Sequence, residues 1–298
     1  ADDIDQRNEN TGDRVAANGF RMAPGETPPD AMNGGDELLV LPKQVPLAIR
    51  VDGLFRVFGD RHQTMTDFES PWVMKLLSTA PLGRHLSYYF YFLLNERGAV
   101  AGAEDAFLYW NDVGNRALDV AVGQFQVSDP LFKRELRLPV DDYMVYRVRV
   151  GDQPATLAYD RGAMLIAQPA GMRFTFEVLN GGGLPEAVDG RLDDDLSKNV
   201  FAHLTGDVAP FLRLGALGYG GRQRGVGGVF DHLWMAGADA TLEHGPAQLN
   251  LQYVHREDDR ATFTPGERRT VTDGGFAELL VIPGGTRTYG YVLYNRVE

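Results

Sequence analysis

Long and short connections alternate between the apolar–polar segments of this chain, and this alternation limits the fold more than any other feature. About thirteen segments show period-two hydrophobicity, the pattern of a β-strand with a different environment on each face. The connections run long, then short, as in GDRHQTMTDFES (59–70) followed by APLGR (80–84). A soluble sandwich has no reason to gather its tight turns at one end, whereas an outer-membrane barrel has short periplasmic turns and long external loops. The sequence therefore predicts an all-β fold, an antiparallel up-and-down transmembrane β-barrel.

The two faces of these segments differ as a barrel wall requires. In the segment 172–179, Phe174 and Phe176 share one face, and Arg173 and Glu177 share the other. The apolar faces are predicted to contact lipid, and the polar faces to line a wet lumen. Soluble sandwiches and β-solenoids also alternate, so this pattern alone leaves them open. The predicted lumen-lining residues are Arg50, Asp52, Arg56, Lys75, Asp119, Arg173, Glu177, Arg213, Asp239 and Glu278.

The boundaries follow from the same pattern. The predicted strands are 47–58, 71–80, 86–95, 104–111, 117–126, 157–168, 172–179, 198–206, 209–219, 231–243, 248–254, 273–283 and 287–297. Aromatic residues near their ends predict girdles at the membrane surfaces, formed by Trp72, Tyr109, Trp110, Tyr219, Trp234, Tyr289 and Tyr291. Bacterial single-chain barrels have even strand numbers, so we expect about fourteen to sixteen strands, at least one of them beyond Glu298. Residues 1–45, rich in Pro, Gly and acids, are predicted to be a poorly structured periplasmic segment, and 46–298 the barrel.

Composition excludes several classes of protein. The formal net charge is −12, the opposite of the usual balance in a nucleic-acid binder, so no nucleic-acid partner is expected. The chain has no cysteine, which excludes disulfides, thiolate metal sites and a covalently attached c-type haem within these residues. We therefore expect no cofactor within this chain. No apolar run reaches about 18 residues, so no transmembrane helix is predicted.

Catalytic and metal-binding motifs are missing from the sequence. The six histidines form no H-x-H or H-x-x-x-H pair, and no G-x-S-x-G nucleophile motif occurs. The glycine-rich stretch 220–228 lacks the G-K-[ST] ending of a phosphate-binding loop, and the acidic stretch 192–198 lacks EF-hand spacing. The chain is predicted not to be an enzyme and to hold no metal, and an outer-membrane hydrolase is the least favoured interpretation.

Two stretches resemble a known family. VGQFQVSDPLF (122–132), followed by DRGAML (160–165), resembles the phosphate-selective porin family of bacterial outer membranes, in which a strand ending G-x-F enters a long, proline-containing third loop. The resemblance implies an outer-membrane porin-like channel for passive diffusion of ions or small solutes, with a loop at about 128–154 folded into the barrel. Charged rings at a constriction select ions. The residues implied there are Lys133, Arg134, Glu135, Arg137, Asp141, Asp142, Arg147 and Arg149.

Some features limit this resemblance or add to it. The predicted lumen carries both signs of charge, so phosphate is not carried over as the solute, and a solvated surface loop with internal ion pairs is the alternative for residues 128–154.

NENTGDRVAANGFRM (8–22) resembles the segment after the c-type haem motif of outer-membrane barrel proteins tied to extracellular electron transfer. The alternative function is therefore a barrel scaffold or sheath for a c-type cytochrome partner. Other expected partners are the lipid bilayer, lipopolysaccharide and further copies of the chain in a homo-oligomer.

Overall fold

The computed structural model describes residues 46–59, 64–100, 102–132, 143–193, 196–284 and 288–298. The periplasmic segment predicted for 1–45 lies outside the described residues. The elements, in chain order, are β1 (Ala48–Gly59), β2 (Thr64–Pro81), β3 (Leu86–Glu96), β4 (Ala103–Trp110), η2 (Val113–Asn115), β5 (Leu118–Gln126), α3 (Met144–Arg147), β6 (Tyr159–Ala167), β7 (Met172–Leu179), β8 (Asn199–Ala209), β9 (Leu212–Arg224), η4 (Val226–Gly228), β10 (Phe230–His244), β11 (Ala247–Asp258), β12 (Thr270–Val281) and β13 (Gly290–Val297).

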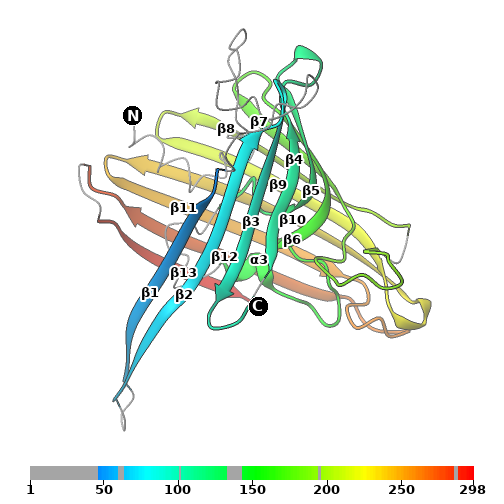
Figure 1. Ribbon diagram of the computed structural model, residues 1–298. Coiled ribbons are helices and arrows are strands. Elements are labelled where there is room, and N and C mark those ends of the chain that lie inside the picture. Colours follow the sequence, from blue (N-terminus) through cyan, green and yellow to red (C-terminus); the bar gives the residue numbers. More distant parts are fainter. Residues whose placement is uncertain (1–45, 60–63, 101, 133–142, 194–195, 285–287) are drawn as a thin grey trace.

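The strands form one antiparallel sheet of 13 strands, in which each strand pairs with its neighbours in sequence. Figure 1 shows this sheet curling into a barrel wall, with the short helix α3 on its inner side. The predicted all-β, up-and-down fold is confirmed, and β1 and β13 are the edges of the sheet. No helix among the described residues is long and apolar enough to cross a membrane.

A meander of this kind places alternate connections at opposite rims. The described parts of the short-connection rim are residues 82–85, 111–117, 168–171, 210–211, 245–246, 282–284 and 288–289. The described parts of the long-connection rim are 127–132, 143–158, 180–193, 196–198 and 259–269, together with the briefer 97–100, 102 and 225–229. The difference in length is clear from β5 onward and small between 97–102 and 111–117. The predicted gathering of tight turns at one rim is thus confirmed for the second half of the sheet.

Several strands extend past their predicted ends because backbone pairing continues there. The strand predicted to end at 206 continues, since β8 runs to Ala209, which pairs with Leu212 on β9. The predicted long connections 59–70 and 220–230 are both mostly strand. β1 and β2 pair as far as Gly59 and Thr64, and β9 and β10 pair as far as Arg224 and Phe230. Antiparallel hydrogen bonding does not depend on the apolar pattern that marked the strands in the sequence.

Burial along the strands is inverted relative to a soluble protein. On β7, Thr175 and Glu177 are 1% and 0% exposed, whereas Met172 and Val178 are 43% and 36% exposed. On β11, Asn250 and other polar side chains are buried, while alternate positions face outward. Apolar residues outside and polar residues inside are the arrangement of a transmembrane barrel wall.

Candidate functional site at the inner wall

Each predicted lumen residue lies on the face of the sheet opposite the outward apolar residues. Arg50, for example, is half-buried next to the exposed Val51. Lys75 is 2% exposed and its Nζ lies 4.6 Å from the centre of the Tyr91 ring, a cation–π contact that offsets part of its desolvation. The buried members are Lys75, Asp119, Arg173, Glu177 and Glu278, and the half-buried ones are Arg50, Asp52, Arg56, Arg213 and Asp239.

The charges of β1 and β2 are arranged in ion pairs. Arg50 Nε lies 2.9 Å from Asp52 Oδ2, on the same strand. Arg56 NH2 lies 3.0 Å from Glu69 Oε2, on the neighbouring strand. These side chains retain part of their exposure, so water screens the pairs and their contribution to stability is small. This part of the inner wall therefore presents both signs of charge to solvent.

The segment between β5 and β6 packs against the inner side of β11 and β12. The Tyr143 hydroxyl donates a 2.7 Å hydrogen bond to Glu278 Oε1, and the Tyr146 hydroxyl donates one of 2.8 Å to Gln252 Oε1. The Tyr143 ring stacks on Phe276 with a centroid distance of 4.0 Å. The sequence placed Glu278 on the inner face. Nothing in it indicated that tyrosines from a distant segment would contact β11 and β12.

An apolar band on the inner wall receives this segment, and sequence analysis missed it. Along β10 the inner positions change from Asp231 to Leu233 and Met235, and then to Asp239. A polar–apolar–polar order among the alternate residues that face inward on one strand is the sequence signal that would have revealed this band. Burial of apolar and aromatic side chains against this band helps to hold the segment in place. The band consists of Phe201, Leu217, Leu233, Met235, Val254 and Phe276, and the segment contributes Leu131, Phe132, Tyr143, Val145, Tyr146 and Leu157.

The returning part of the segment is fastened by buried polar groups near the long-connection rim. Gln153 Nε2 donates to Asp231 Oδ2 at 2.6 Å. Arg256 donates to both carboxylate oxygens of Asp258, at 2.7 and 2.8 Å, and to the Ala155 carbonyl at 2.9 Å. Bidentate geometry and the additional carbonyl satisfy a buried guanidinium that would otherwise be costly.

The predicted constriction residues divide into two groups. Lys133, Arg134, Glu135, Arg137, Asp141 and Asp142 lie outside the described residues. Arg147, the last residue of α3, and Arg149, shortly after it, are described and exposed. Arg149 makes no hydrogen bond or ion pair with any residue in the described ranges. These arginines are therefore positive charges on a segment whose tyrosines are anchored to the inner wall.

A histidine–aspartate pair spans the strands β8 to β10 on the inner wall. His203 Nε2 lies 2.9 Å from Asp239 Oδ2, and the side chains alone are 2% and 8% exposed. The pair passes over Gly215 on β9, where a Cβ atom would lie 2.3 Å from Asp239 Oδ1. Glycine at this position is what allows the two side chains to meet.

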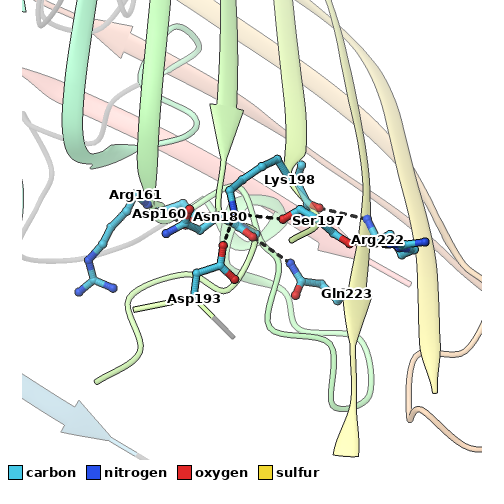
Figure 2. A network of polar contacts seen from close by, with 10 residues as sticks. Asp160, Arg161, Asn180, Asp193, Ser197, Lys198, Arg222 and Gln223 are labelled. Atoms are coloured by element: carbon cyan, nitrogen blue, oxygen red, sulfur yellow. Dashed lines mark hydrogen bonds and ion pairs between the residues drawn. The ribbon is translucent and has the colours of Figure 1, made fainter. Parts of the chain in front are cut away.

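Polar contacts also secure the connection 180–198 at the long-connection rim. Figure 2 shows Lys198 paired with Asp193, and Arg222 of β9 beside Ser197. Arg222 Nε and NH2 donate to Ser197 Oγ at 3.1 and 2.9 Å. The acidic stretch considered in the sequence is thus tied to β9 by side-chain contacts. Among the described residues, no group of His, Asp or Glu side chains is arranged to hold a metal ion.

The predicted aromatic girdles are wrong for two tyrosines. Tyr109 is buried and donates a 3.0 Å hydrogen bond to Asp119 Oδ2, and Tyr219 is buried and accepts one of 2.8 Å from Asn199 Nδ2. Their hydroxyls bond to inner-wall polar groups, so their rings belong to the interior. Trp110 and Trp234 are exposed as a girdle requires.

Comparison with known proteins gives matches in structure only. No family model and no curated protein matches the sequence. An anion-selective porin from Comamonas acidovorans matches over 84% of this chain and 78% of its own, with a TM-score of 0.51 and 12% identity. OmpTdeltaL8, a loop-deletion mutant of the Vibrio cholerae outer membrane protein OmpT, matches over 85% and 94%, with a TM-score of 0.43 and 10% identity. OccK8 (OprE) of Pseudomonas aeruginosa matches over 84% and 67%, with a TM-score of 0.35 and 11% identity.

Of these three proteins, the Comamonas porin has a TM-score above 0.5, and at 12% identity the likeness shows the fold alone. The meander order, the inverted burial and this likeness agree. The chain has the fold of the β-barrel porins of bacterial outer membranes.

Proposed function

We propose that this chain forms a porin-like channel in a bacterial outer membrane, through which ions or small solutes diffuse passively. The observation that carries the proposal is the inverted wall with a segment anchored inside it by Tyr143 and Tyr146. Polar inner residues support a water-filled path, and apolar outer residues support contact with lipid. Lipopolysaccharide at the outer face and a homo-oligomeric assembly are further parts of the proposal.

The segment between β5 and β6 is proposed to narrow this path and to set its charge selectivity. Arg147 and Arg149 are exposed on the anchored part of the segment. Fixed charges at a constriction favour ions of opposite sign. We assign these arginines, with Lys133, Arg134 and Arg137, to a positive set, and Glu135, Asp141 and Asp142 to the opposing negative set.

Planar-bilayer recording tests both parts of this proposal. The wild-type chain is expected to produce ion conductance, and Arg147→Gln combined with Arg149→Gln is expected to move the reversal potential in a salt gradient toward cation preference. Arg268→Gln removes an exposed positive charge from the connection 259–269 and serves as the control. A wild-type chain without conductance would overturn the channel. An unchanged reversal potential in the double variant would overturn only the role of the segment.

The cytochrome-sheath alternative rests on residues 8–22, which lie outside the described residues, so no structural observation favours it. A haem absorption band in the complex purified from membranes, together with absence of conductance, would support the sheath over the channel.

A further inference from the structure

A hollow of about 520 Å³ opens at the long-connection rim, apart from the inner-wall contacts described above. Its walls come from the end of the segment between β5 and β6, from the β9–β10 connection and from the β11–β12 connection. Small-molecule sites typically occupy about 300–1,000 Å³. The lining residues are Asp152, Pro154, Arg224, Gly225, Gly227, Gly228, Thr262 and Phe263.

Close backbone contacts define the shape of this hollow. The Asp152 amide donates a 2.8 Å hydrogen bond to the Ala261 carbonyl, which joins the first wall to the third. A Cβ at Gly225 would lie 2.2 Å from Phe263 Cγ, so the ring packs directly on the glycine backbone. Phe263 itself has φ +53°, a left-handed conformation that costs a bulky residue free energy. The chain therefore holds an aromatic ring in this wall against its local backbone preference.

Two side chains of opposite charge line the same hollow. The side chains of Arg224 and Asp152 are exposed, and neither makes a hydrogen bond or ion pair with any residue in the described part of the chain. Other arginines at this rim are engaged: Arg222 with Ser197, Arg260 with the Phe230 carbonyl, and Arg269 with Glu257. Arg224 and Asp152 are therefore the two charges in this hollow that stay available to a ligand.

We propose that this hollow binds a small zwitterion that carries an apolar group, as an amino acid with an aromatic side chain does. Arg224 binds the carboxylate, Asp152 binds the ammonium group, and the Phe263 ring contacts the apolar part. A simple carboxylate meets repulsion from Asp152, and a simple amine meets repulsion from Arg224, so the combination selects molecules that carry both charges. The inference does not depend on conduction through the lumen.

Calorimetric titration of the full chain, folded in detergent micelles, tests this site with L-phenylalanine as the probe. Saturable binding is expected for phenylalanine. Affinity for 3-phenylpropionate, which lacks the ammonium group, and for phenethylamine, which lacks the carboxylate, is expected to be lower by about tenfold or more. Absence of phenylalanine binding, or equal affinity for 3-phenylpropionate, overturns the proposal.

Charge variants test the assignment of each group. Arg224→Gln and Asp152→Asn are each expected to weaken phenylalanine binding by about tenfold. Asp152→Asn is also expected to improve binding of 3-phenylpropionate, because the repelling carboxylate is removed; loss of folding cannot produce that gain. Arg268→Gln is the control and is expected to bind as the wild type does. Unchanged binding in both charge variants overturns the assignment. The titration measures binding and not current. If the chain binds phenylalanine here but shows no conductance in the bilayer experiment, only the proposed channel is refuted.

Discussion

The hydroxyl of Tyr143 joins the segment between β5 and β6 to the inner wall, and its removal is expected to release that segment part of the time. It donates a 2.7 Å hydrogen bond to Glu278 Oε1, and Glu278 is buried. In Tyr143→Phe the stack on Phe276 stays, and Asn250 Nδ2 still donates to the same oxygen at 3.1 Å. The change therefore removes the hydrogen bond to the buried carboxylate and keeps the aromatic stack.

The size of the effect follows from that bond. A hydrogen bond to a charged group contributes about 1.5–3 kcal/mol, whereas the retained aromatic stack contributes about 0.5–1.5 kcal/mol beyond its buried area. Since about 1.4 kcal/mol corresponds to a factor of ten in an equilibrium, the docked-to-released ratio is expected to fall by roughly ten- to a hundredfold. Tyr143→Ala removes the stack as well and is expected to shift the ratio further.

Single-channel recording measures this shift as more frequent transitions between current levels. Tyr253→Phe is the matched control: its hydroxyl also bonds to a carboxylate, that of Asp273, but on the exposed outer face, so little change is expected. Current records of Tyr143→Phe and Tyr143→Ala that both match the wild type would refute the reasoning.

Further changes test the wall and a loop. Phe176→Arg, at an outward position on β7, is expected to lower the free energy of unfolding in lipid vesicles by ~2–4 kcal/mol, and Phe176→Leu to have little effect; equal urea midpoints would contradict a lipid-facing sheet. Gly215→Ala is expected to cost about 1–3 kcal/mol because its Cβ would collide with Asp239, whereas Gly220→Ala on the same strand has open space and serves as the control in the same urea titration. Partial burial raises the pKa of the Glu267 carboxyl, but hydrogen bonds from the Thr262 hydroxyl and amide outweigh it and hold the pKa below its ordinary value. Because the pKa is lower in the folded loop, the ionised Glu267 carboxylate stabilises the loop at pH values above the unfolded-state pKa. This stabilisation is lost as the pH falls through the pKa of the folded loop. The hydrogen-exchange protection factor of the Thr262 amide is therefore expected to fall in acid, and Glu267→Gln to remove that pH dependence; the same dependence in both would show that another group is responsible.

Strand positions, their order and the inverted faces could be predicted from the residues alone. Side chains alternate across any extended backbone, so Arg173, Thr175 and Glu177 share a face whatever surrounds them. Connection lengths then placed the tight turns at one rim, because successive antiparallel strands must turn at opposite ends. Boundaries were less accurate, as at the end of β8, which runs to Ala209 and not to 206, because pairing with a neighbouring strand decides where a strand stops.

The contacts inside the wall required the tertiary structure. Tyr143 and Glu278 are 135 positions apart, and no local pattern in either strand or segment encodes their meeting. For the same reason Tyr109 and Tyr219 were assigned to the membrane surface, although hydrogen bonds to Asp119 and Asn199 hold them inside. The hollow between Asp152, Arg224 and Phe263 exists only because the strand order and curvature of the sheet bring three distant connections together at a common rim. Backbone periodicity is a local property that a sequence displays directly, whereas these sites arise from which surfaces the curved sheet places face to face.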